Sequence, residues 1–478
     1  MTRHALSRQE ISARPPGVMY APPMAPASAR SSPFAVLGLR GMTLELWLLL
    51  AYIVVMGIGD LRAAKLGIYI GSVPIFLTDI TLILLLVTSF VRWPSRMLYW
   101  LSEGVGAGPV GRVVWILCIV ATIYFVFAIP TYGLFAVRDL AIFGYSLFFP
   151  LTCFAIRDRR DAVRLLRYLT YAGVVLALML LFHEATNIDF GLFGQNTRFI
   201  LGRAVHEEGT GDAGAFAVFS LVALFAYVSC ERKLIRFHSI CAIACFFALA
   251  STTSRAGVVG VALAAGVTFF CVTSRHRVRY AIFAGFLALI VVLSPLIPVV
   301  VPGAGLLQGL RLAVLSALTG GTHDPTASFR MIRWKIIFEL WMTHPVFGVG
   351  FGRMLLPLTL PSLRGTERLG GFNMGMPHNT FLFLAARMGL IGLLSVVFCW
   401  FFMLRRLFLV SKRTRRADEL ATTNILAMML GLAFFVLFFE RPMLNTMFWI
   451  VMAIGQRLLE CQRVTAVNSR YAFNSSRT

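Results

Sequence analysis

Long apolar runs separated by short polar loops dominate this chain of 478 residues. A helix needs about 20 apolar residues to cross a bilayer. The pattern therefore predicts an all-α fold, a polytopic membrane helix bundle with about twelve transmembrane helices. The predicted spans are 43–59, 73–91, 113–129, 138–156, 168–183, 213–230, 238–253, 256–273, 280–300, 379–403, 421–438 and 443–458.

Two of these spans, 238–253 and 256–273, are short and separated only by polar residues. They are expected to form a hairpin that breaks within STTSRAG at 251–257. The whole bundle is expected to cover 41–460. A polar, Pro/Ala/Ser-rich segment at 1–40 predicts a disordered cytoplasmic tail without a removable signal peptide, and 461–478 predicts a second cytoplasmic tail.

Basic residues are unevenly divided between the two sides of the predicted bundle. Loops of one parity hold 20 lysines and arginines, against 5 in the short loops of the other parity. Cytoplasmic loops carry the excess of Lys and Arg, so the first set is predicted to face the cytoplasm together with both termini. The first set comprises 92–112, 157–167, 231–238, 274–279 and 405–416; the second comprises 60–72, 130–137, 184–212 and 439–442.

Composition agrees with a membrane protein, since 58% of residues are hydrophobic and only 14% are charged. The net charge of +23 lies in short loops, which favours contact with anionic membrane lipids over a nucleic-acid partner. The chain has no GxxxxGK[ST] phosphate-binding loop. The cysteines lie mostly in apolar runs without a completing histidine or carboxylate, so neither a metal, a disulfide nor a cofactor is expected.

Two loops on the predicted outer face are long, 184–212 and 302–378. Long loops in compact proteins are often functional. The second contains an amphipathic segment near 327–343, which predicts a helical cap on the membrane surface. Its apolar side is expected to hold Ile332, Ile336, Ile337, Leu340 and Trp341. The glycines of PVFGVGFGR, just after this segment, predict a tight reversal with positive φ.

His378 is the candidate catalytic base, because a neutral imidazole at the mouth of the bundle can accept a proton from a sugar hydroxyl. The alternative is a histidine that only bonds backbone at the start of a helix. Asn379 is suited to cap that helix. Arg330 and Arg333 lie one turn apart on the amphipathic segment, where guanidinium groups can bind a diphosphate or, alternatively, extend toward lipid headgroups.

The first outer loop carries Arg198 and Arg203 near Glu207, Glu208 and Asp212. These charges form either a second clamp for an anion or a solvated loop with weak ion pairs. Arg203 is preferred because it is closer to the following span.

Arg255 lies between two apolar runs, where an arginine is either functional or extends to the interface. Arg138 and Asp139 are expected to form a local ion pair at the start of the fourth span.

The stretch 330–392 resembles the O-antigen ligase family and the related O-antigen polymerases. The resemblance rests on an arginine-led helix with Trp334, then HPVFGVGFG, then PHNTFLFLAARMGLIG. SRAG at 254–257 and IGSVPIFLTDI at 70–80 are also similar to family segments.

The resemblance implies a bacterial inner-membrane glycosyltransferase of the polytopic C-type fold. It implies transfer of a glycan from undecaprenyl pyrophosphate to a lipid A–core sugar or a growing polysaccharide, at the periplasmic face, with inversion and without a metal. By the same resemblance, His378 activates the acceptor hydroxyl or supports the reacting centre, Arg330 holds the leaving pyrophosphate, and Arg203 is the arginine of the preceding loop. The expected substrate-binding residues are Arg198, Arg333, Arg255 and Asn379. The alternatives are a polymerase of the same superfamily, a lipid-linked sugar flippase or transporter, and a scaffold without chemistry.

Overall fold

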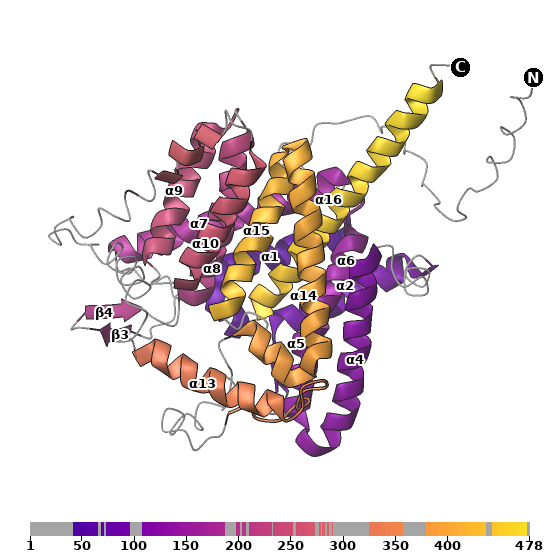
Figure 1. The fold of residues 1–478 in the computed structure, drawn as a ribbon, viewed down its shortest axis with the longest axis vertical. Helices are drawn as coiled ribbons and strands as arrows, with labels where there is room; N and C mark the ends of the chain where they lie inside the picture. Colours follow the sequence, from indigo (N-terminus) through magenta and orange to yellow (C-terminus); the bar gives the residue numbers. More distant parts are fainter. Residues whose placement is uncertain are drawn as a thin grey trace, which may run out of the picture. The chain divides into compact units, whose positions relative to one another are not determined.

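The computed structural model is a bundle of helices with two short antiparallel hairpins, one of which is labelled in Figure 1. It describes residues 42–65, 68–70, 73–95, 108–186, 197–200, 203–206, 210–231, 233–251, 255–272, 277–278, 280–282, 284–285, 289, 325–356, 379–435 and 442–475. The tail expected at 1–40 and most of the span expected at 280–300 lie outside these residues.

The described helices follow the predicted spans closely. They are α1 (Leu44–Lys65), α2 (Leu77–Arg92), α4 (Gly108–Tyr132), α5 (Leu134–Gly144), α6 (Phe148–Ala155), α7 (Arg159–Thr186), α8 (Thr210–Cys230), α9 (Ile235–Ser251), α10 (Arg255–Cys271), α13 (Pro325–Met342), α14 (Thr380–Thr414), α15 (Ala417–Phe435) and α16 (Pro442–Ser475). The segment expected to be a C-terminal tail continues α16 as helix to Ser475.

Four of the described helical segments are long and apolar enough to cross a membrane: Gly108–Tyr132, Leu134–Ala155, Arg159–Phe182 and Thr380–Thr414. Shorter apolar helices occur at Leu44–Met56, Ala215–Cys230, Ile235–Leu249 and Gly257–Cys271. The chain is thus a polytopic helical membrane protein in the part described.

The predicted span 138–156 is built from three pieces instead of one continuous helix. A 3₁₀ turn, η2 (Tyr145–Leu147), separates α5 from α6. Pro150 has no N–H to bond the carbonyl of Ser146, and a tighter turn is a common response to such a gap. The three pieces together still form one helical segment, Leu134–Ala155, long enough to cross a membrane.

The expected hairpin of the seventh and eighth spans breaks where predicted, since α9 ends at Ser251 and α10 begins at Arg255. The two helices nevertheless pack mainly on different partners. Helix α9 lies against α7 and α8, whereas α10 lies against α15. Glycines allow the second contact, because a Cβ on Gly260 would come within 2.9 Å of the Met428 carbonyl oxygen.

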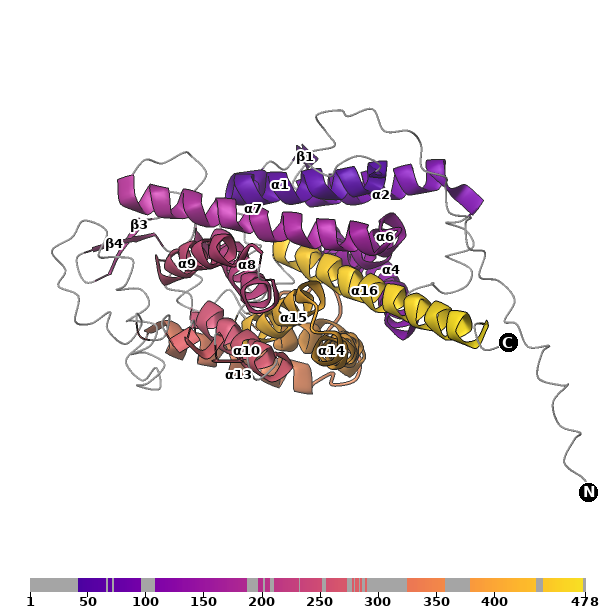
Figure 2. The same ribbon diagram turned by 90° about the horizontal axis from the view of Figure 1, so that it is seen from above.

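Helix α15 lies at the centre of the bundle, between α8, α10, α14 and α16 (Figure 2). Nearly all of its described side chains are buried, as expected for a helix that is apolar around its circumference. Its Asn424 donates to the Val222 carbonyl of α8 at 3.0 Å and to the Thr268 hydroxyl of α10 at 2.8 Å. One amide therefore joins three helices.

Two antiparallel hairpins complete the described fold. The first pairs β1 (Ile68–Ile70) with β2 (Val73–Ile75) just before α2. The second pairs β3 (Thr197–Ile200) with β4 (Arg203–His206) within the first long loop. The β3–β4 hairpin lies in a loop predicted to face outward, whereas β2 occupies the first residues of the predicted span 73–91, whose helix α2 begins only at Leu77.

Asn424→Leu is expected to lower the free energy of unfolding by about 1 kcal/mol, because it removes two interhelical hydrogen bonds and leaves their partners buried. Thermal unfolding in detergent, followed by labelling of the buried free cysteines, measures the change. Ser395→Ala is the control, since Ser395 bonds only to Ile391 of its own helix. Equal unfolding temperatures for Asn424→Leu and wild type would contradict the role of this amide.

Candidate functional site

The glycine-rich turn after α13 forms as the sequence predicted. Gly348, Gly350 and Gly352 have φ values of 71°, 82° and 76°, in the left-handed region that side chains other than glycine rarely adopt. The Gly348 amide donates to the His344 carbonyl at 2.7 Å and closes the first part of the reversal. The chain thereby leaves α13 and returns toward α14.

A kink in α14 receives this turn. Gly389 is non-helical, with φ 63° and ψ −156°. The Leu390 amide therefore donates to the Pro345 carbonyl at 3.0 Å, outside its own helix, and the Ala386 carbonyl accepts from Val349 at 2.7 Å. The turn and the helix thus exchange backbone hydrogen bonds, and each satisfies groups that the other leaves open.

A buried ion pair fixes the same junction. The Arg387 guanidinium lies 3.2 Å from the Asp139 carboxylate, and the two side chains are 5% and 3% exposed. Asp139 also accepts from the Gly352 amide at 2.6 Å, while Arg387 donates to the Arg353 carbonyl at 2.5 Å. The pair joins α5, the turn and α14.

The expected role of Asp139, a local pair with Arg138, is therefore incomplete, since its carboxylate makes a tertiary contact to another helix. Neither Asp139 nor Arg387 was identified as part of the site from sequence. The sequence feature that could have identified this pair is Arg387, because an arginine within the apolar run TFLFLAARMGLIG is costly unless it has a partner.

Aromatic side chains cover the turn. Phe351 stacks on Phe143 with ring centres 5.1 Å apart and lies 5.6 Å from the ring of Tyr124. The Tyr124 hydroxyl donates to the Phe347 carbonyl at 2.5 Å. Helices α4 and α5 therefore hold the turn together with α14.

Asn379 caps α14 as predicted. Its side-chain oxygen accepts from the Leu382 amide at 3.0 Å, and its amide nitrogen donates to the Phe434 carbonyl of α15 at 3.2 Å. The cap therefore anchors the start of α14 to the end of α15. His378, its neighbour in sequence, lies outside the described residues.

Helix α13 forms over the predicted amphipathic segment and packs against α14. Its buried side matches the expected one only in part: Ile337 is buried as predicted, but Ile332 is 56% exposed. Arg333 takes the place of an apolar residue and is only 3% exposed. It is therefore packed within the protein and does not extend along the surface.

Burial lowers the pKa of Arg333 from its usual value, because removal from water disfavours the charged form. Arg330, one turn earlier, is half-buried. The two candidate arginines of α13 therefore occupy different environments, one enclosed and one accessible.

The remaining candidates lie on other elements. Arg198 and Arg203 belong to the same hairpin, where Arg198 pairs with Val205 and Arg203 pairs with Ile200. Arg255 begins α10. Figure 1 shows the β3–β4 hairpin and α13 at the same end of the bundle. The backbone thus brings the elements that carry Arg198, Arg203, Arg330 and Arg333 to one end.

An apolar crevice of about 380 Å³ lies between α2, α4 and α5. Most of its lining is apolar, including Leu82, Ala121 and Leu140. Its polar residues include Asp79 and Tyr145, whose carboxylate and hydroxyl are joined by a 2.9 Å hydrogen bond. Helix α5 therefore contributes both to this crevice and, through Asp139, to the turn.

Comparison with known proteins supports the resemblance over part of the chain. The apolar helices define a polytopic membrane protein. Residues 240–397 match the family described as O-antigen ligase, which confirms the resemblance to the O-antigen ligase and polymerase family. The match includes α10, α13, the glycine turn and the first half of α14. No curated protein matches the chain.

Arg387→Met is expected to destabilise the protein by about 3–5 kcal/mol, because it leaves the buried Asp139 carboxylate without its cation. The double variant Asp139→Leu/Arg387→Met should recover part of this loss. Thermal unfolding in detergent measures both. Lys335→Gln is the control, since Lys335 and Glu339 form an exposed pair on α13. A single variant as stable as the control would contradict the proposed importance of this ion pair.

Proposed function

We propose that this protein is an inner-membrane glycosyltransferase that moves a glycan from undecaprenyl pyrophosphate to a sugar hydroxyl at the periplasmic face. The match of residues 240–397 to the O-antigen ligase family carries the proposal. Such proteins act in general on lipid-linked glycans and polysaccharides. The acceptor proposed here is the sugar of a lipid A–core, and a growing polysaccharide is the alternative.

The reaction proposed is a direct displacement with inversion and without a metal. The acceptor oxygen forms a bond to the anomeric carbon while the bond from that carbon to the pyrophosphate oxygen breaks. The pyrophosphate leaves with the electron pair, and His378 takes the proton of the acceptor hydroxyl.

Arginines supply the charge that such a leaving group requires. Arg330 is half-buried and accessible, which suits a group that binds and releases a diphosphate. Arg333 is enclosed, and a nearby anion would favour its charged form. Arg203, Arg198 and Arg255 are proposed to contact the same diphosphate or the first sugars, and preorganised charge of this kind lowers the barrier to departure.

Asn379 and the turn are proposed to position this chemistry. The Asn379 cap fixes the start of α14 against the end of α15. The exchange of hydrogen bonds between the turn and the kink limits movement of α13 relative to α14. A site that must align two reactants benefits from such rigidity.

Arg330→Ala and His378→Ala are each expected to lower glycan transfer at least about 100-fold, because each removes a group that acts in the transition state. Transfer is measured with purified protein, a lipid-linked glycan and acceptor. Lys335→Gln, on the same helix as Arg330, is the control and should retain wild-type transfer. Normal transfer in both alanine variants would remove the catalytic assignment.

The products made by cells that lack the protein separate a ligase from a polymerase. Loss of a ligase leaves lipid-linked polymer and bare lipid A–core, whereas loss of a polymerase leaves single repeats on lipid A–core. Accumulation of donor on the cytoplasmic side would instead support a flippase. A transporter should carry charges near the middle of the membrane, but Arg330 and Arg333 lie on α13, within the long loop.

The crevice between α2, α4 and α5 is proposed to hold part of the isoprenoid chain of the donor, because its lining is mostly apolar. Ala141→Trp should fill the crevice and raise the KM for the lipid-linked donor about tenfold, without a matching change for the acceptor. Ile119→Trp, at an exposed position of α4, is the control. An unchanged donor KM in Ala141→Trp would contradict this placement.

A further inference from the structure

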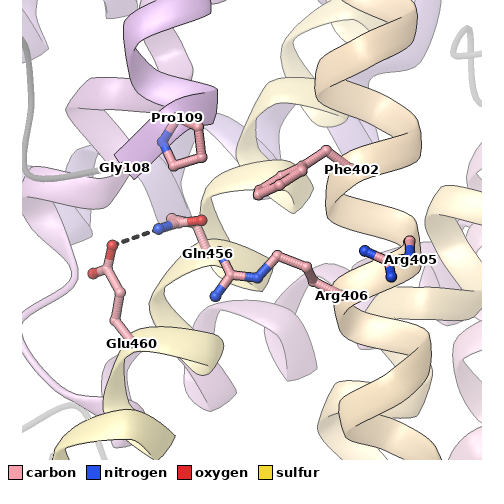
Figure 3. Close-up of a pocket in the computed structure, with 7 residues that line it drawn as sticks. All are labelled: Gly108, Pro109, Phe402, Arg405, Arg406, Gln456 and Glu460. Carbon is pink, nitrogen blue, oxygen red and sulfur yellow. Dashed lines mark hydrogen bonds between the residues drawn. The ribbon is translucent and has the colours of Figure 1, made fainter.

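A second pocket, of about 500 Å³, lies between the start of α4, the second half of α14 and α16 (Figure 3). The residues that line it are Gly108, Pro109, Phe402, Arg405, Arg406, Gln456 and Glu460. Arg405 lies 16 residues beyond the kink at Gly389, which corresponds to about 24 Å of helix. The pocket is therefore remote from the glycine turn and its candidate site.

The charge of this pocket favours an anion. Arg405 and Arg406 are adjacent on α14, and Arg405 is exposed and makes no ion pair with the described residues. Glu460 is the one carboxylate of the lining, and it is already bonded to Gln456 at 2.6 Å and to Arg457 at 2.7 Å. The start of α4 adds the positive end of a 25-residue helix.

The side chain of Gln456 offers the pocket a hydrogen-bond acceptor. Its side chain lines the pocket although the residue is only 3% exposed, and its Oε1 has no hydrogen-bond partner among the described residues. The amide cannot simply be turned around, because its Nε2 donates to Glu460 at 2.6 Å. A buried acceptor left open in this way is costly, so a ligand hydroxyl would satisfy it.

An apolar strip leads along α14 to the two arginines. Leu394, Phe398 and Phe401 are 58%, 48% and 51% exposed, and they precede Arg405 at steps of four, three and four residues. Residues with this spacing lie on one face of a helix. A molecule with its anionic group beside Arg405 could therefore extend an acyl chain over the strip.

We propose that this pocket binds an anionic phospholipid whose headgroup carries hydroxyls, such as phosphatidylglycerol. The phosphate lies between Arg405, Arg406 and the start of α4, and a headgroup hydroxyl donates to Gln456 Oε1. This site adds to the proposed glycosyl transfer and does not depend on it. Basic pockets between membrane helices commonly bind such headgroups on the side that carries the excess of Lys and Arg.

Native mass spectrometry of the full-length protein in mild detergent tests the site by titration with phosphatidylglycerol, phosphatidylcholine or phosphatidate. Wild type should bind phosphatidylglycerol about tenfold more tightly than phosphatidylcholine. Arg405→Gln/Arg406→Gln should lose about tenfold in that affinity, because two charge-assisted contacts disappear. Gln456→Met should remove the preference for phosphatidylglycerol over phosphatidate.

Arg413→Gln is the matched control, because it removes an exposed arginine from the same helix outside the pocket and should bind like wild type. If the double arginine variant does not fold, Arg405→Gln alone carries the test, since Arg405 is exposed. Unchanged phosphatidylglycerol binding in the arginine variants would overturn the site. Equally tight binding of soluble sn-glycerol 3-phosphate would overturn the lipid assignment in favour of a free phosphate ester.

Discussion

The buried ion pair between Asp139 and Arg387 is the contact on which the architecture of the candidate site depends. It joins α5 to α14, and each partner also bonds the backbone of the glycine turn: Asp139 accepts from the Gly352 amide and Arg387 donates to the Arg353 carbonyl. Two charges withdrawn from water are tolerable only when the opposite charge and further hydrogen bonds offset the lost hydration. The turn is therefore the element that satisfies the pair, and the pair is what holds the turn in place.

The kink at Gly389 follows from the same constraint. A continuous helix would use the Ala386 carbonyl and the Leu390 amide internally, but here both bond to the turn. A Cβ on Gly389 would come within 2.1 Å of the Val346 carbonyl oxygen, so no larger residue fits this crossing. Rigidity at this point allows α13, with Arg330 and Arg333, to keep a fixed relation to the capped start of α14.

The two ends of α14 have different surroundings. One end meets the turn and α13, where enclosed and accessible arginines suit a diphosphate that must bind and depart. The other end carries Arg405 and Arg406 beside an open amide oxygen, which suits a resident lipid. A single long helix thus connects the candidate catalytic region with the proposed lipid site, about 24 Å away.

Sequence alone determined the helical class, the positions of most helices, the α13 helix, the glycine turn and the Asn379 cap, because these depend on local composition and hydrogen bonding. It did not determine which side of α13 is buried, the break at Tyr145–Leu147, or the pairing of Asp139 with Arg387. Those features depend on which helices become neighbours. Such pairings between distant residues leave no periodic pattern in the chain, so only the tertiary structure decided them.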